Sequence, residues 1–200
     1  MAGLTKASEG YITWKGVEQR PRELTNKIGV VMQDPEPYFL GKTVLDELIM
    51  WRDDKTPDDV RRVMSMVGLN HVSLLKPPSK LSGGQKKRLA LASQLMRDPL
   101  PELFVMDEPF AGVDAIAQKQ LVEVIGSLKK RFAIVIVTHE PGELLDLANR
   151  IVHIAKKTAI EVPRDVIERA KRVRKQNRKL LRESIKREKQ QFQSKKESPS

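Results

Sequence analysis

The pattern of hydrophobic and polar positions predicts short buried strands that alternate with amphipathic helices. Apolar residues run together or alternate in five stretches that we expect to be strands: Tyr11–Lys15, Ile28–Met32, Leu103–Met106, Phe132–Val137 and Ile151–Ile154. Apolar residues at helical spacing, or a capping residue at the start, mark five expected helices: Thr43–Trp51, Asp58–Val67, Ser82–Arg97, Ala115–Lys130 and Glu140–Asn149. The alternation favours an α/β fold in which helices cover both faces of a parallel sheet.

The last part of the chain has a different pattern. From about Ala159 to Gln193 the residues favour a helix, but its apolar positions form only a broken seam that is interrupted at Asn177. Of the net charge of +11, residues 156–200 contribute +10, from 16 Lys and Arg against six Asp and Glu. We therefore predict an almost neutral domain over residues 1–155 and a basic tail, helical or partly disordered, over residues 156–200.

Composition excludes several kinds of protein. The chain has no cysteine, which excludes a disulfide scaffold, a thiolate zinc site and a cysteine nucleophile. Its longest apolar stretch, Phe132–Val137, is far shorter than the roughly 20 residues that cross a bilayer. The first residues hold no apolar core of the kind that a secretory signal needs. We expect a protein without a transmembrane segment, which reaches a membrane only through a partner.

Two acidic residues follow one of the expected strands. Asp107 and Glu108 come directly after Leu103–Met106, at the carboxyl edge of the sheet, where parallel sheets bind their ligands. One carboxylate there can hold Mg²⁺ while its neighbour orients or deprotonates water. An isolated acid pair is more often only a charged turn after a strand, so this pattern alone leaves both interpretations open.

A glycine-containing loop opens one of the expected helices. In Leu81-Ser82-Gly83-Gly84-Gln85 the glycines expose backbone N–H groups, and the helix N-terminus adds partial positive charge, so phosphate oxygens can bind there. His139 and Gln33 also follow expected strands. Taken singly, each of these features is more often structural: a capped helix start, a hydrogen-bonding histidine or a turn residue.

The order of these features resembles one family. Over about residues 3–155 the chain resembles the ATP-binding cassette (ABC) ATPases, the nucleotide-binding domains of ABC transporters. Five segments carry the resemblance: Val30–Pro35 resembles the Q-loop, Leu81–Gln85 the signature motif, Leu103–Glu108 the Walker B strand, Ala111–Asp114 the D-loop and Thr138–Glu140 the switch histidine. The resemblance implies a parallel sheet of the P-loop NTPase type with an inserted helical subdomain at about residues 43–99.

The resemblance also implies roles for the residues of one nucleotide site. Asp107 would hold Mg²⁺, and Glu108 would be the general base that polarises the attacking water. Gln33 would sense Mg²⁺ and the γ-phosphate, and His139 would contact the γ-phosphate. The implied cofactors are ATP and Mg²⁺.

A second group of residues would act on a neighbouring molecule. Family members dimerise head to tail around two ATP molecules, so Ser82 and Gly84 would donate to a nucleotide bound by the opposite subunit. Gly83 and Gln85 belong to the same nucleotide-binding motif, and Asp114 would link the two sites. The implied partner is a second ABC ATPase domain, identical or different.

The implied function is ATP binding and hydrolysis that drives transport through separate membrane subunits. Residues Gln33–Trp51 would face the transmembrane partner. The segment from Gln33 to Glu47 looks similar to importer and energy-coupling-factor cassettes and to small soluble plant and plastid members. The expected location is therefore the cytoplasm or the plastid stroma, at the surface of a membrane.

One motif of the family is absent from these 200 residues. No Gly-x-x-x-x-Gly-Lys-[Ser/Thr] string occurs, and Ala2–Gly10 resembles the family's segment just after that phosphate-binding loop, called Walker A. We therefore expect a sheet that is incomplete at its N-terminal side. Three explanations stay open: a truncated gene model or isoform of a complete ATPase, a degenerate subunit that lends its signature motif to a complete partner, or a fragment without independent function.

The basic tail leaves a function of another class open. A charge of +10 could follow a phosphate backbone or an anionic membrane surface, and some ABC-type ATPases act on ribosomes or DNA. Against nucleic acid, the only aromatic residue of the tail is Phe192, which leaves almost no base-stacking capacity. The other interpretations are a solvated helix with charge pairs and a helix whose seam docks on the domain.

The absent loop generates a prediction. Its backbone N–H groups and its lysine supply most of the affinity for nucleotide in this family. A protein made of these 200 residues alone should therefore bind ATP more weakly than the micromolar range. Equilibrium titration with a labelled ATP analogue measures this affinity, and micromolar binding by the monomer would contradict the prediction.

Overall fold

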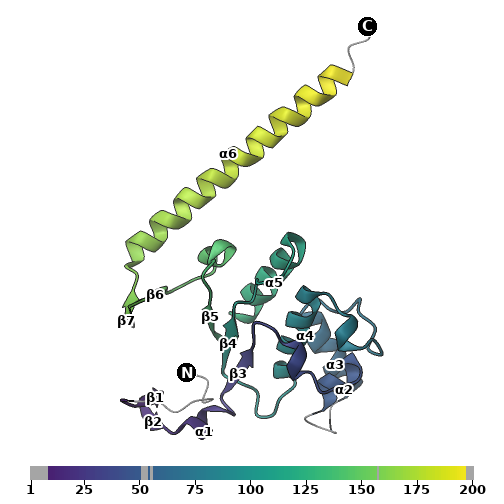
Figure 1. The fold of residues 1–200 in the computed structure, drawn as a ribbon, viewed down its shortest axis with the longest axis vertical. Coiled ribbons are helices and arrows are strands. Elements are labelled where there is room, and N and C mark those ends of the chain that lie inside the picture. Colours follow the sequence, from purple (N-terminus) through teal and green to yellow (C-terminus); the bar gives the residue numbers. More distant parts are fainter. Residues whose placement is uncertain (1–8, 51–53, 55, 157, 197–200) are drawn as a thin grey trace. The chain divides into compact units, whose positions relative to one another are not determined.

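The computed structural model describes residues 9–50, 54, 56–156 and 158–196 (Figure 1). The chain divides into two compact units, Met1–Glu140 and Pro141–Ser200. This division falls before the limit at residue 155 that the charge pattern suggested, so residues 141–155 group with the basic tail. The limits of the domains stay a prediction.

The first unit is built on a three-stranded parallel sheet. The strands are, in order across the sheet, β3 (Ile28–Val31), β4 (Leu103–Asp107) and β5 (Ala133–Val137). Ile28 pairs with Leu103, and Leu103 pairs with Ala133. The three strands therefore begin side by side and end at the same edge of the sheet. The alternating strands and helices of the sequence predict this parallel arrangement.

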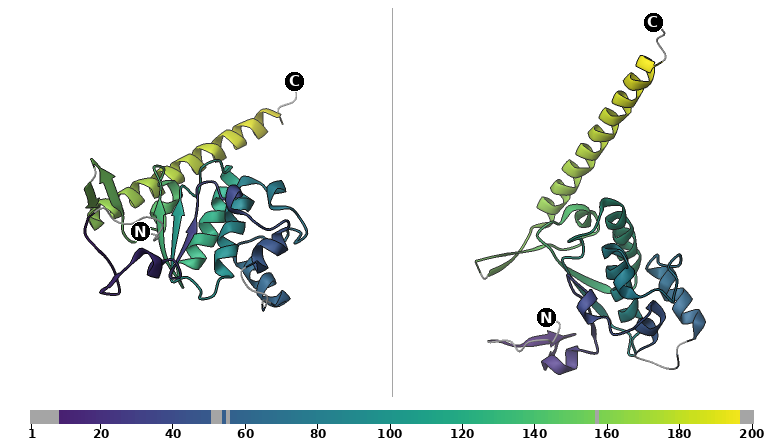
Figure 2. Two further views of the ribbon diagram at one scale, coloured as in Figure 1. Left: turned by 60° about the horizontal axis from the view of Figure 1, so that its bottom comes forward. Right: turned by 45° about the vertical axis from the view of Figure 1, so that its right-hand side comes forward.

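The helices of the first unit begin at capping residues that the sequence marks. They are α2 (Val44–Ile49), α3 (Pro57–Met66), α4 (Gly83–Leu95) and α5 (Ala115–Leu128). Thr43, Thr56 and Ser82 each accept a hydrogen bond from the backbone N–H three residues further on. Asp114 caps α5. The inserted helices α2 and α3 pack on α4, and α4 and α5 lie side by side against one face of the sheet (Figures 1 and 2).

The core of this unit lies between the sheet and these helices. Phe104 and Met106 of β4 are buried, and the Phe104 ring packs edge-on against Phe132 with 5.1 Å between the ring centroids. On the other face, Leu103 and Val105 are only half-buried, and β5 is half-buried to exposed along its length. The core of the first unit therefore lies on one face of the sheet, and the covering of both faces by helices stays a prediction.

Shorter elements complete the first unit: β1 (Ile12–Trp14), β2 (Val17–Gln19), α1 (Pro21–Leu24), and the 3₁₀ turns η1 (Glu36–Tyr38) and η2 (Pro78–Lys80). β1 and β2 form an antiparallel hairpin, and its two-residue turn of Lys15 and Gly16 has positive φ at both positions. The strand expected at Tyr11–Lys15 is thus one arm of a hairpin. Residues 2–8 of the segment that resembles the family's segment just after Walker A lie outside the described residues, as does Trp51.

The second unit holds η3 (Gly142–Asp146), β6 (Val152–Ala155), β7 (Thr158–Glu161) and α6 (Arg164–Lys196). The strand expected at Ile151–Ile154 pairs antiparallel with β7 rather than with the parallel sheet. Residues 159–161, expected in the tail helix, belong to β7, since β-branched Thr158 and Ile160 favour a strand and Pro163 favours a helix start just after it. The helix expected at Glu140–Asn149 is a short 3₁₀ stretch.

Polar contacts hold the tail helix α6 to η3 within the second unit. Arg178 donates to Glu143 of η3 at 2.5 Å, and Lys171 donates to the carbonyl oxygen of Ala148 at 3.1 Å. The exposed apolar side chains of its seam include Val166, Val173 and Leu180. Ile167 of α6 and Leu144 of η3 are buried as well, so the helix is held by an apolar residue outside the seam together with its charged residues.

The close packing of α4 on α5 generates a prediction. A Cβ atom at Gly84 would lie 2.7 Å from the Cβ of Ala117 and 3.3 Å from the Cγ1 of Val113. Gly84→Ala should lower the free energy of unfolding by about 1–2 kcal/mol, because overpacking outweighs the helix propensity that alanine adds. Urea denaturation measures the change.

Gly83→Ala is the matched control, because its Cβ would meet only the carbonyl oxygen of Gly112, at 3.1 Å. It should lower stability less than Gly84→Ala does. A Gly84→Ala protein as stable as the wild type would contradict the close contact between the two helices.

Candidate functional site

Four of the predicted site residues lie where the three parallel strands end. Gln33 comes two residues after β3, Asp107 is the last residue of β4 and Glu108 follows it, and His139 comes two residues after β5. Since the strands end level, all four lie at one edge of the sheet. The structure brings Glu108 and His139 into contact. The Gln33 side chain is exposed and makes no hydrogen bond within the described part of the chain.

The carboxylate of Glu108 is held at three points by the two residues that follow β5. Thr138 Oγ1 donates to Oε2 at 2.9 Å, and the backbone N–H of His139 donates to Oε1 at 2.9 Å. The His139 ring atom Nδ1 lies 2.7 Å from the same Oε1. The Glu108 side chain is 18% exposed and that of His139 is 74% exposed, so the carboxylate is sheltered while the imidazole faces solvent.

The main chain at Glu108 has a conformation that residues other than glycine rarely adopt. Its φ is +40°, in the left-handed region, which costs a non-glycine residue about 1–2 kcal/mol. The Glu108 N–H donates to the carbonyl oxygen of Val137 at 2.9 Å, which extends the contact between the ends of β4 and β5. Strain of this kind clusters at functional sites. Here it accompanies the turn that brings the carboxylate to Thr138 and His139.

The contact changes the ionisation of both partners. The hydrogen bond from the His139 side chain, helped by those from Thr138 and the His139 N–H, holds the pKa of Glu108 below its ordinary value. The hydrogen bond to Glu108 and the negative charge of that carboxylate raise the pKa of His139 above its ordinary value. The arrangement favours an ionised Glu108, which can accept a proton.

Asp107 offers an oxygen ligand to a metal ion. It is half-buried, and its carboxylate has no hydrogen-bond partner among the described residues. The same residues contain no group of three or more His, Asp or Glu side chains that could enclose a metal. Mg²⁺ is usually held by one or two carboxylates together with water and substrate phosphates. The chemistry of Asp107 therefore fits the predicted Mg²⁺ site.

The predicted signature residues open α4. Ser82 Oγ accepts from the N–H of Gln85 at 3.3 Å, and Gln85 Oε1 accepts from the N–H of Ser82 at 3.1 Å, so the two cap each other. Ser82 and Gly83 are exposed, whereas Gly84 is buried against α5. The start of this helix therefore lies at the surface, where its dipole favours an anion.

The D-loop lies against the start of α4. The carbonyl oxygen of Gly112 is 3.1 Å from the position that a Cβ of Gly83 would take. Asp114 accepts from the N–H groups of Ile116 at 2.9 Å and Ala117 at 3.0 Å, and these bonds, that of Ala117 first, hold the pKa of Asp114 below its ordinary value. Within this chain Asp114 is a helix cap, and its role between two subunits stays a prediction.

Sequence reasoning missed Thr138 as a partner of Glu108. The resemblance groups Thr138 with the switch histidine only as its neighbour, although its hydroxyl makes one of the three contacts to the carboxylate. Its place at the end of an apolar strand, beside the strand that ends in Asp107 and Glu108, is the signal that could have identified it.

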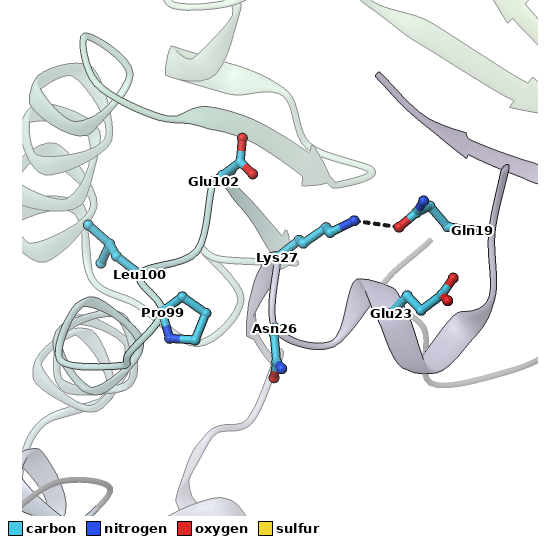
Figure 3. Close-up of a pocket in the computed structure, with 7 residues that line it drawn as sticks. All are labelled: Gln19, Glu23, Asn26, Lys27, Pro99, Leu100 and Glu102. Carbon is cyan, nitrogen blue, oxygen red and sulfur yellow. Dashed lines mark hydrogen bonds between the residues drawn. The ribbon is translucent and has the colours of Figure 1, made fainter. Parts of the chain in front are cut away.

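A pocket of about 550 Å³ lies away from this site (Figure 3). Lys27 and Glu102, which help to line it, directly precede β3 and β4, so the pocket is at the amino ends of the strands. In Figure 3 the Lys27 side chain donates to Gln19 across it. None of the predicted site residues lines this pocket.

Comparisons with known proteins identify the family. The family model described as "ABC transporter" matches residues 1–111, more than half of the chain. The chain is 35% identical over 166 residues to ABC transporter I family member 11, chloroplastic, of Arabidopsis thaliana, over 75% of this chain and 59% of that protein. It is 36% identical over 165 residues to the energy-coupling factor transporter ATP-binding protein EcfA1 of Thermotoga maritima, over 79% of this chain and 62% of that protein. The chain belongs to the ABC transporter family.

Solved structures support the fold. The chain matches cbiO1 from Clostridium perfringens, described as part of the ABC transporter complex cbiONQ, with a TM-score of 0.75 and 25% identity, over 94% of this chain and 79% of that one. A nucleotide-free ATP-binding cassette from an ABC transporter has the same fold, with a TM-score of 0.66 at 23% identity. The predicted fold class is confirmed. The chain spans less than two thirds of the length of either relative named above.

The contact between Glu108 and His139 generates a prediction about pH. Glu108→Gln should lower the pKa of His139 toward its ordinary value, because the charged acceptor is removed. In the wild type, the Glu108–His139 pair should stabilise the fold between the two pKa values. This contribution should be lost as the pH rises through the raised pKa of His139, and also as the pH falls through the lowered pKa of Glu108. NMR titration of the His139 ring measures the shift.

Glu140→Gln is the matched control, since Glu140 lies 3.8 Å from the other ring nitrogen of His139 and raises its pKa least among the groups involved. It should change the His139 pKa less than Glu108→Gln does. An unchanged His139 pKa in Glu108→Gln would show that the contact does not form in solution.

Proposed function

We propose that this chain is an ABC-type ATPase subunit that couples ATP binding and hydrolysis to transport through separate membrane subunits. The observation that carries the proposal is the sheltered carboxylate of Glu108, next to Asp107 at the carboxyl edge of the parallel sheet. An ionised acid beside a metal-binding acid, at the edge where such sheets bind ligands, suits the activation of water for phosphoryl transfer.

Each residue of this edge has a proposed role in hydrolysis. Asp107 would hold Mg²⁺, with Gln33 as a further ligand, and the ion when bound would neutralise phosphate charge. Glu108 accepts a proton from the water that attacks the γ-phosphate, and the bond from the γ-phosphorus to the β–γ bridging oxygen breaks. His139, exposed beside Glu108, contacts the γ-phosphate. The low pKa of Glu108 supports its ionised state before the reaction.

The proposed partner in nucleotide binding is a second cassette, arranged head to tail. Ser82 and Gly83 are exposed at the start of α4, which supports contact with a nucleotide held by a neighbouring molecule. The motif Ser82–Gln85 supplies the donors of this contact. The proposed part of Asp114 is supported by Gly112, two residues before it, whose carbonyl oxygen lies against Gly83.

The coupling to membrane transport rests on the relatives. cbiO1 is described as part of an ABC transporter complex, and EcfA1 is named as an energy-coupling factor transporter ATP-binding protein. The surface proposed to meet a membrane subunit is Gln33–Trp51, where Tyr38 and Leu40 are exposed apolar side chains. Among the described residues no helix has the length and apolar character that a bilayer span requires. The proposed location is the membrane surface on the cytoplasmic or plastid stromal side.

Two alternatives stay predictions. Binding of nucleic acid or ribosomes by residues 156–200 is supported by charge alone. A degenerate subunit that lends its signature motif to a complete cassette would use the same exposed start of α4.

The proposal generates a test on the full-length protein, purified with the partners that it binds. The wild type should hydrolyse ATP in the presence of Mg²⁺, and Glu108→Gln should lower kcat by about 100-fold or more, because a positioned general base is lost. A phosphate-release assay measures the rate, and nucleotide-dependent association of the cassettes should persist.

Glu102→Gln is the matched control, since this exposed acid precedes the same strand at its other end and pairs with Lys15 at 2.5 Å. It should hydrolyse ATP at the wild-type rate. Wild-type turnover by Glu108→Gln would remove Glu108 as the base, and a wild-type complex without ATPase activity would overturn the proposed function.

A further inference from the structure

Lys87 is a buried cation that the proposed function does not use. It lies on α4, one helical turn after Gly83, and is only 4% exposed. Lysine is rarely buried unless its ammonium group has partners. The adjacent Lys86 reaches a different place, since its ammonium group pairs with Glu36 at the protein surface.

The partner of Lys87 is the main chain of the proposed general base. Lys87 Nζ donates to the carbonyl oxygen of Glu108 at 2.8 Å. Burial lowers the pKa of Lys87, and the negative charges of Glu108, Asp34 and Asp107 oppose that shift. The ammonium group therefore interacts electrostatically with acids of the Q-loop and of the Walker B strand.

The hydrogen bond acts on the residue whose backbone is strained. Glu108 has a φ of +40°, and its N–H is fixed by the carbonyl oxygen of Val137. Lys87 fixes the carbonyl group of the same residue. With both main-chain groups held, the direction in which the Glu108 side chain leaves the backbone is set.

We propose that Lys87 is a positioning residue, which holds the main-chain turn at Glu108 and so aims the Glu108 carboxylate at Thr138 and His139. The catalytic consequence of this inference rests on the proposed function, but the positioning itself does not. Because Lys87 belongs to the helix that begins with the signature motif, a displacement of α4 would also displace the base.

A role in positioning can be separated from a role in stability. Lys87→Met keeps the length of the side chain but removes the donor, so it leaves the carbonyl oxygen of Glu108 unpaired and also lowers the stability of the chain. A positioning role predicts that the loosening is greatest at the turn of Glu108, whereas a merely structural role predicts that it is the same throughout the sheet.

The test measures hydrogen exchange of the Glu108 backbone N–H by NMR, together with the urea midpoint of unfolding. Lys87→Met should speed exchange at Glu108 by about tenfold or more beyond the change that the shift in the urea midpoint accounts for. Lys86→Met, the matched control, should leave exchange at Glu108 unchanged. Lys87→Arg keeps the charge and the donors, and should restore most of the protection.

Three results would overturn the inference. Unchanged exchange at Glu108 in Lys87→Met would show that the turn does not depend on Lys87. Exchange that is faster by the same factor throughout β4 and β5 as at Glu108 would show a structural role only. Exchange in Lys87→Arg as fast as in Lys87→Met would show that the donor has no effect.

A second measurement addresses catalysis in the full-length ATPase. Lys87→Met should lower kcat by about 10-fold to 100-fold, because a misplaced base costs rate, and should change the KM for ATP by less than about twofold. A raised KM with an unchanged kcat would contradict positioning of the base. If the wild type does not hydrolyse ATP, the proposed function fails, and the exchange experiment still decides the role of Lys87.

Discussion

The parallel pairing of β4 with β5 brings an acid and a histidine from distant parts of the chain into contact. Asp107 lies opposite Val137 in the register, so the residues that follow, Glu108 and Thr138, leave the sheet side by side. The carboxylate then takes three hydrogen bonds within 2.7–2.9 Å. The ionisation of the pair and the strained turn at Glu108 both depend on this register.

Buried polar side chains of two helices hold neighbouring loops. Lys87 of α4 holds the turn at Glu108, which follows β4. Glu47 of α2 accepts from the N–H groups of Leu40 and Gly41, in the loop between η1 and α2, at 2.9 Å. Because buried groups of this kind are costly to leave unpaired, they fix the loops more firmly than surface ion pairs would.

The sequence predicts the parallel strands and the helix starts well, because apolar runs and capping residues such as Thr43 and Ser82 act locally. It misses a local pairing. Val152–Ala155 forms a hairpin with Thr158–Glu161, and the connecting residues Lys156 and Lys157 are not the Gly, Asn or Asp residues that usually mark a hairpin turn. Lys87 stands in a run of three basic residues, which predicts an exposed side chain. It lies three residues after Gly84 and four before Leu91, so it shares the buried face of α4 with them. This spacing is the signal that could have identified Lys87 as buried. The roles of the site residues follow from resemblance and stay predictions.

The most direct measurement replaces Mg²⁺ by Fe²⁺ in the full-length protein with ATP and maps the backbone cuts that radicals make around the bound ion. If Asp107 holds the metal of the nucleotide site, ATP-dependent cuts should fall beside Asp107 and Glu108, and Asp107→Ala should abolish them. Cuts that occur without ATP, or that fall only elsewhere, such as beside Lys27 and Glu102 at the other end of the strands, would contradict the site.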